Sequence, residues 1–147
     1  MAIVKSEWTK GRKQAPVSGE ARNVVTERFD FTIGADMAAN DIVELAVLPA
    51  YHFVVDAVLI LSAGLGAGRT VDVGIMSGDV GEEDNTRTSG NELYAAQDSA
   101  AAVASRMVKA DGFLLAPGNK DRSIGVKVSD TVTAANQKVT LVLQYAQ

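Results

Sequence analysis

The sequence contains no cysteine, a single histidine and few aromatic residues. The lack of cysteine excludes a disulfide scaffold, a thiol nucleophile and zinc–thiolate sites. An aromatic content of 5% argues against a lectin or glycosidase and against a stacking face for single-stranded nucleic acid. No apolar run approaches the length of a membrane span, and residues 1–8 lack the apolar core of a secretion signal. We therefore expect a protein without a membrane partner, made and used without crossing a membrane.

Motifs for catalysis and for nucleotide binding are missing as well. His52 is the one histidine on which a Ser-His-Asp triad would have to be built, and no Gly-x-Ser-x-Gly elbow supplies a nucleophile. The stretch SAGLGAGRT (62–70) fails as a P-loop, because its opening glycine would fall on Ala63 and its lysine is Arg69. The residues that follow alternate like a strand, whereas a dinucleotide fingerprint opens a helix. We predict a strand-to-strand loop here, a structural or surface role for His52, and no enzyme, small-molecule substrate or cofactor.

The stretch SGDVGEEDNTRTSGNEL (77–93) predicts a long polar loop with an acidic cluster. Its clustered carboxylates are Asp79, Glu82, Glu83 and Asp84. Oxygen-rich loops can hold calcium, but the EF-hand spacing fails because Gly81 occupies a ligand position. We interpret the cluster as a solvated acidic loop and predict no metal site.

Charge divides the chain into two parts. Residues 1–22 carry a net charge of +3, and the remainder carries −7. An acidic body repels nucleic acid over most of its surface, so we expect no nucleic-acid partner. Residues 1–22 are polar and show no sustained period, which predicts an extended basic N-terminal arm followed by one domain over 23–147; a poorly ordered terminus is the alternative. Trp8 is expected to dock, either on this chain or on a neighbour.

Apolar periodicity predicts an all-β domain. Apolar and polar residues alternate with period two along 25–33, 71–76, 124–128 and 139–145. Residues 41–48 form another apolar stretch, closed by a proline. Residues 52–61 are apolar on both faces, which predicts a central strand buried on both sides, within which Asp56 needs a partner.

Two segments depart from this pattern. Leu93, Ala96, Ala100 and Met107 fall at helical spacing in an alanine-rich stretch, which favours a helix over 93–110, with an irregular excursion as the alternative. Residues 112–118 predict a short strand ended by a Pro-Gly turn. With seven or eight short strands between turns, the fold class expected is an antiparallel β-sandwich, jelly-roll-like, with an extended arm and at most one helix; a small barrel is the alternative.

Three stretches carry a resemblance to a known family. VDVGIMSGDVGEEDNTR (71–87), DGFLLAPGNKDRSIGVKVSD (111–130) and KVTLVLQYAQ (138–147) resemble the decoration, or head cement, proteins of tailed bacteriophages. The similarity covers roughly residues 24–147. It implies a β-sandwich or jelly-roll virion protein, made in the host cytoplasm, that sits on the outer surface of a capsid. Such proteins act as dimers or trimers, bind where subunits of the major capsid protein meet, and hold the shell against packaged DNA.

The candidate partner-binding residues come from the arm and not from the resemblance. They are Lys5, Trp8, Lys10, Arg12 and Lys13. An arm that orders on binding can lie across a neighbour, where Trp8 and the alkyl stems are buried while the cations meet acidic patches.

Two other functions stay open at the level of sequence. A receptor- or glycan-binding sandwich of a fibre or spike would carry its specificity in loops 77–92 and 117–123. A small hydrolase would require a cleft with close carboxylates or a His52–Asp pair.

Overall fold

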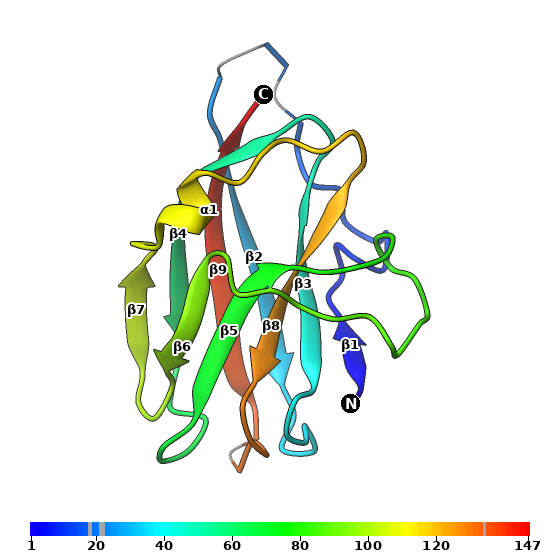
Figure 1. Cartoon of the computed structure of the whole chain (residues 1–147). Coiled ribbons are helices and arrows are strands. Elements are labelled where there is room, and N and C mark those ends of the chain that lie inside the picture. Colours follow the sequence, from blue (N-terminus) through cyan, green and yellow to red (C-terminus); the bar gives the residue numbers. More distant parts are fainter. Residues whose placement is uncertain (18, 21–22, 134) are drawn as a thin grey trace.

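The computed structural model describes residues 1–17, 19–20, 23–133 and 135–147. In this described part the chain forms strands and one short helix (Figure 1). Their bounds are β1 (Ile3–Lys5), β2 (Val25–Ile33), β3 (Ile42–Leu48), β4 (Phe53–Leu61), β5 (Thr70–Ile75), β6 (Tyr94–Asp98), β7 (Val103–Arg106), α1 (Ala110–Phe113), β8 (Arg122–Val128) and β9 (Gln137–Ala146). The boundary predicted between residues 22 and 23 falls beside residues that lie outside the described part.

Two sheets pack face to face (Figure 1). One has the strand order β1-β3-β8-β5-β6 and the other has the order β2-β9-β4-β7. The pairing of β1 with β3 is parallel, and the other ladders are antiparallel. Without β1, each sheet has four strands, and successive strands alternate between the sheets except for β5 and β6, which pair within one sheet. This is the arrangement of a jelly roll. The all-β, jelly-roll-like sandwich predicted from the sequence is confirmed.

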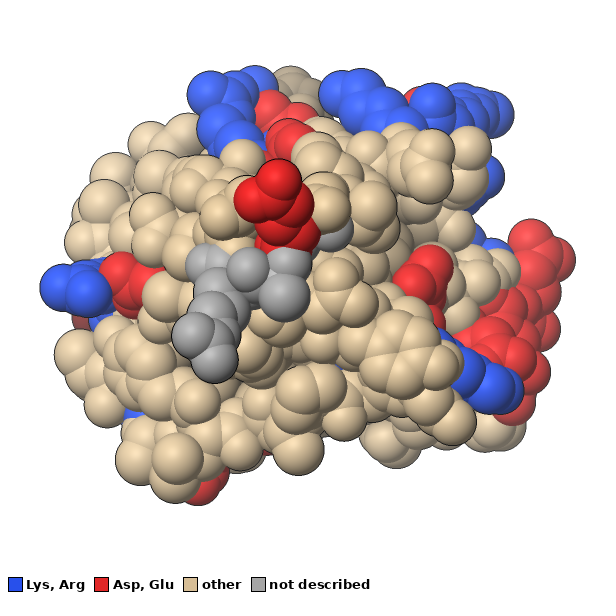
Figure 2. Space-filling model, turned by 90° about the horizontal axis from the view of Figure 1, so that it is seen from above, with Lys and Arg blue, Asp and Glu red and all other residues tan. Residues whose placement is uncertain are grey.

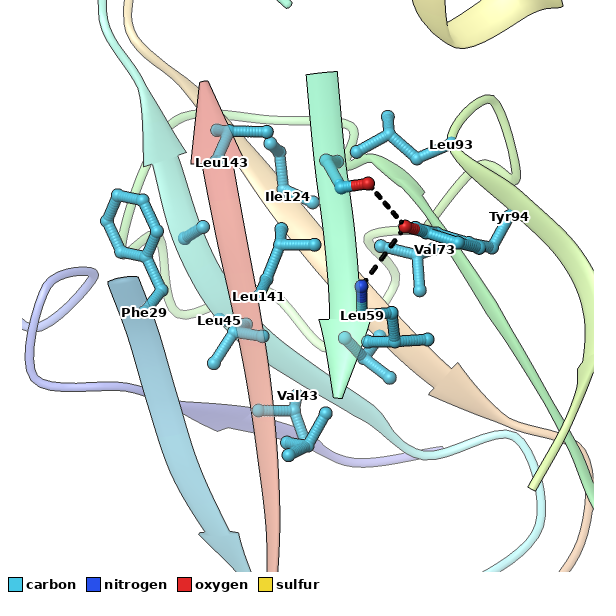
Figure 3. Close-up of a cluster of buried hydrophobic side chains, with 14 of the residues drawn as sticks. Phe29, Val43, Leu45, Leu59, Val73, Leu93, Tyr94, Ile124, Leu141 and Leu143 are labelled. Carbon is cyan, nitrogen blue, oxygen red and sulfur yellow. Dashed lines mark hydrogen bonds between the residues drawn. The ribbon is translucent and has the colours of Figure 1, made fainter. Parts of the chain in front are cut away.

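The period-two segments form the strands that supply the core. The segments predicted at 25–33, 71–76, 124–128 and 139–145 correspond to β2, β5, β8 and β9. Their inward side chains, among them Phe29, Val73, Ile124 and Leu141, have no exposed surface and meet between the sheets (Figure 3). Alternation on a strand places every second side chain on this inner face, which is why the pattern located these strands correctly.

β4 differs from its prediction in one respect. Ala57, Leu59 and Leu61 face the core, but Val58 on the other face is only partly buried. Burial on both sides was wrong, because a sandwich has two layers and the outer face of each sheet meets solvent. The partner expected for Asp56 is present: Arg106 on the adjacent β7 donates from Nε to its Oδ2 at 2.8 Å.

The helix favoured over 93–110 was wrong. This segment forms β6 on one sheet and β7 on the other. Tyr94 explains the outcome: its buried hydroxyl accepts a hydrogen bond from the Leu59 N–H (3.1 Å) and lies within donor reach of the Ala57 carbonyl (2.9 Å) (Figure 3). The Ser105 carbonyl on β7 lies 2.8 Å from the same hydroxyl. These tertiary bonds and the sheet pairing outweigh the helix propensity of the alanines.

The short strand predicted over 112–118 was also wrong. The segment begins inside α1, which packs against β4, and then continues as an irregular loop. Gly112 lies where a Cβ would come within 2.4 Å of the Met107 sulfur, so the helical turn fits closely over the buried methionine. Within the part of the chain that the structure describes, no helix has the length and apolar character of a membrane span.

Candidate functional site

The basic arm lies against the body of the protein (Figure 1). Its β1 pairs with β3, and the contacts continue beyond the strand. The Ser6 hydroxyl donates to the Leu45 carbonyl at 2.6 Å, and the Thr9 hydroxyl donates to the Glu44 carbonyl at 2.9 Å. The first part of the arm is therefore fixed to the five-stranded sheet.

Trp8 docks on its own chain. Its side chain is buried, and its ring meets Phe29 of β2 edge to face, with ring centroids 5.0 Å apart. Because β1 belongs to one sheet and Phe29 to the other, the arm closes the side of the sandwich between β3 and β2. The Lys13 ammonium lies 4.4 Å from the centroid of the Trp8 ring, a cation–π contact.

The structure brings all the candidate residues together around one groove, here called the arm groove, of about 820 Å³. Lys5, Trp8, Lys10, Arg12 and Lys13 line it. The body contributes Val47, Pro49, Val80, Glu83 and Asp121. Figure 2 views the molecule from above Figure 1. It shows basic side chains along one edge and acidic side chains at a neighbouring corner. The groove thus offers cations beside apolar side chains and the carboxylates of Glu83 and Asp121.

The cations of the arm groove have partners within the chain. The Lys5 ammonium donates to the Gly81 carbonyl at 2.7 Å, while Lys10 and Arg12 lie 3.7 Å and 3.4 Å from carboxylate oxygens of Glu7. Lys10 and Arg12 are exposed, so their ion pairs contribute only about 0–1 kcal/mol each. A carboxylate from a partner can replace Glu7 at small cost, whereas Lys5 is committed to the fold.

The acidic loop uses its carboxylates to hold its own backbone. Glu82 accepts from the Asp79 N–H at 2.9 Å, and Asp84 accepts from the Thr86 hydroxyl and N–H. The hydrogen bonds from Thr86, first the hydroxyl and then the N–H, lower the pKa of Asp84. Among the described residues, no group of three or more histidines and carboxylates is placed to hold a metal ion.

A buried ion pair that was not predicted anchors this loop. Arg87 Nη2 lies 2.9 Å from Glu44 Oε1, and both side chains are almost fully buried. The Ser123 hydroxyl and the Gly81 N–H also donate to the same Glu44 oxygen, at 2.5 Å and 3.0 Å. The sequence does indicate one half of this pair. Glu44 lies inside the apolar strand β3, and a carboxylate there requires a buried donor. Arg87, in a polar loop, gave no signal.

His52 and the glycine-rich loop have structural roles. His52 is buried, with Nδ1 2.8 Å from the Ala50 carbonyl oxygen, and its ring meets Tyr145 edge to face at 5.5 Å. Residues 62–69 connect β4 to β5, as the strand-to-strand prediction required. Gly66 and Gly68 have positive φ angles in this connection.

Two solved structures resemble this fold along almost its whole length. A chain in the capsid of Ralstonia phage GP4 has 38% sequence identity, covers 99% of this chain and 98% of its own length, and gives a TM-score of 0.93. A chain in the cyanophage Pam1 capsid asymmetric unit has 17% identity over 92% of both chains and a TM-score of 0.54, which shows a shared fold alone. No family model and no curated protein matches the sequence.

Proposed function

We propose that this chain, which belongs to the same family as the protein in the capsid of Ralstonia phage GP4, decorates and stabilises a phage capsid. The observation that carries the proposal is 38% identity along 99% of the chain to a protein assembled in a capsid. In this role the protein sits on the outer surface of the shell, at contacts between subunits of the major capsid protein. It acts through binding, as a homodimer or homotrimer.

The arm groove is the part of the surface that supports this proposal. It combines exposed cations, which acidic side chains on a shell would attract, with apolar residues that a partner segment can cover. Lys10, Arg12 and Lys13 are the residues we propose for direct contact. Trp8 and Lys5 act by holding the arm in place, because both side chains are largely buried in contacts within the chain.

Repeated weak contacts suffice for attachment to a shell. A capsid presents the same subunit junction many times, and a homo-oligomer can engage several junctions at once. Simultaneous engagement raises the overall affinity far above that of a single contact. An arm groove of modest affinity is therefore adequate for a decoration protein, and no deep pocket is required.

Binding to shells that lack this protein tests the proposal. The wild-type chain should co-sediment with such shells, and the variant Lys10→Gln/Arg12→Gln/Lys13→Gln should bind at least about tenfold more weakly, with a smaller dependence on salt. The matched control is Arg28→Gln/Arg106→Gln/Lys138→Gln, which removes the same charge from the four-stranded sheet. The control should bind like the wild type.

Two results would contradict the proposal. Shells that fail to bind the wild-type chain would remove the decoration function. Equal binding by the two triple variants would remove the arm groove as the binding site. Binding of the chain to a glycan array, with no binding to shells, would favour a receptor-binding role.

A further inference from the structure

Large apolar side chains are exposed mainly at one end of the sandwich. Eight of them are exposed among the described residues, and six of the eight lie at this end. We call these six residues the end face: Val17, Val24, Tyr51, Phe53, Phe113 and Leu114. Exposed apolar residues scattered singly are ordinary, whereas a gathered set marks an interaction surface.

Separate segments bring the end face together. Phe53 is the first residue of β4 and Val24 directly precedes β2, and both strands pair there with the last residues of β9. The Tyr145 hydroxyl of β9 donates to the Pro16 carbonyl, which places Val17 at the same end.

The remaining residues of the end face belong to the β3–β4 turn, to the end of α1 and to the loop that follows α1. The Tyr51 N–H donates to the Gly118 carbonyl at 2.6 Å, which joins the β3–β4 turn to the loop after α1. That loop crosses the end of the sandwich in Figure 1 and begins at Leu114, directly after Phe113, the last residue of α1. Leu114 is 79% exposed, so nothing in the chain covers most of its side chain.

Tyr51 is held in a strained backbone conformation. Its φ angle of 63° lies in the left-handed region, which glycine and asparagine tolerate and an aromatic residue disfavours. Its side chain is nevertheless 59% exposed, so packing within the chain does not account for an aromatic at this position. Strained residues of this kind gather at functional surfaces, and tyrosine is enriched at the centres of interfaces.

We propose that the end face is the contact through which copies of this chain associate. The end face gathers six exposed apolar side chains, and charges of both signs lie at this end of the molecule in Figure 2. A second copy brings the same apolar side chains together with basic and acidic groups that can face groups of opposite sign. A uniformly acidic or uniformly basic partner would complement only the charges of one sign.

The inference deepens the proposed function, on which its role in attachment rests. Val17 belongs to the end face and also lines the arm groove. Association through the end face therefore brings the arm grooves of neighbouring copies close to one another. Such an assembly would present several grooves to a shell together.

Sedimentation of the isolated chain over a wide range of concentration tests the inference. The wild type should form a discrete oligomer, and Leu114→Asp should shift the protein to monomer, with association weakened at least about tenfold. Tyr51→Gly should also weaken association, and it should keep or raise the melting temperature because glycine relieves the strained φ angle. This second variant separates loss of association from loss of folding.

Val108→Asp provides the matched control. Val108 is 88% exposed and lies between β7 and α1, outside the end face, so this variant should associate like the wild type. A wild type that stays monomeric at every concentration would overturn the inference. So would association by Leu114→Asp and Tyr51→Gly that equals that of the wild type.

The two proposals fail separately. If the chain binds shells but remains monomeric, the end-face inference and the proposed homo-oligomeric state are wrong, while decoration of the shell stands. If the chain associates through the end face but does not bind shells, only the decoration function is wrong.

Discussion

Arg87 and Glu44 lie 43 positions apart in the sequence, and their Nη2 and Oε1 atoms are 2.9 Å apart inside the protein. Glu44 belongs to β3, and Arg87 belongs to the connection between β5 and β6, so the pair ties a surface loop to a sheet. At Gly81 the same loop donates its N–H to Glu44 and accepts a hydrogen bond from Lys5. The sheet, the loop and the arm thus meet in one hydrogen-bonded network. This network fixes the positions of the arm and the loop, which both line the arm groove.

Glu44→Gln should destabilise the protein strongly. The substitution leaves the Arg87 cation buried without its counter-charge, and removing one partner of a buried pair typically costs about 3–5 kcal/mol. Urea denaturation should report this loss as a lower midpoint. The exposed pair of Lys120 and Asp79 supplies the control, since Asp79→Asn should change stability by less than about 1 kcal/mol. Similar effects at the two sites would contradict the role assigned to Glu44.

Gly81→Ala should displace the loop from the arm. Gly81 has a φ angle of 73°, and a Cβ there would come within 2.5 Å of the Thr9 carbonyl oxygen. Gly11 has the same φ angle but has nothing within 4 Å of the corresponding position, so Gly11→Ala carries the backbone strain alone. We expect the melting temperature to fall further for Gly81→Ala than for Gly11→Ala. Equal losses would show that the approach to Thr9 is not limiting.

Trp8→Ala should release the arm from the sandwich. The substitution removes the buried ring that meets Phe29, and aromatic-to-alanine changes in a core typically cost about 3–5 kcal/mol. Limited proteolysis with trypsin should then cut at Lys10, Arg12 and Lys13 much faster than in the wild type. Lys13→Ala removes only the cation–π contact with the ring, worth about 0.5–1 kcal/mol at an exposed site, and should leave the arm protected. An arm that stays protected in Trp8→Ala would contradict this anchoring role.

Alkaline pH should unfold the protein through two tyrosines. Burial raises the pKa of Tyr94 and that of Tyr145 to about 12, and the charge of Glu27 adds to the shift at Tyr145. An unfolded tyrosine has a pKa of about 10, so the neutral phenols contribute stability that is fully present below pH 10 and is lost as the pH rises toward 12. Melting temperatures measured across this window should fall.

Tyr94→Phe tests this assignment. The variant lacks one of the two titrating groups, so its melting temperature should fall less steeply above about pH 10 than that of the wild type. It should also be less stable at neutral pH, because the hydrogen bonds of the Tyr94 hydroxyl to β4 and β7 are lost. A slope equal to that of the wild type would show that another group governs alkaline unfolding.

The sequence predicted most of the sandwich because one face of each sheet is buried. Period-two alternation located β2 through Phe29 and located β9 through Leu141, where burial and side-chain direction agree. It failed for β6 and β7, because exposed alanines carry no face preference and the decisive contact of Tyr94 is made with a distant strand. The role of Tyr94 is visible only once the two sheets are in place.

The candidate site could be predicted only in part. Cations around Trp8 indicated a binding surface in the arm, and the structure gathers them around one groove. That the arm would pack against its own body depends on Phe29, which lies on the other side of a turn-rich segment and is not linked to Trp8 by any local pattern. The end face escaped prediction for a similar reason, since Val17, Tyr51 and Leu114 meet only through tertiary contacts.

The place of β9 in the four-stranded sheet has a consequence for biosynthesis. β9 lies between β2 and β4 and pairs with both along almost its whole length. Until β9 has left the ribosome, β2 has no neighbour in its sheet and β4 lacks one of its two neighbours. Nascent chains therefore leave apolar edges of these strands unpaired until β9 has been synthesised, and chaperones can protect them up to that point. Incomplete chains on the same polysome can therefore aggregate through these strands before β9 is available.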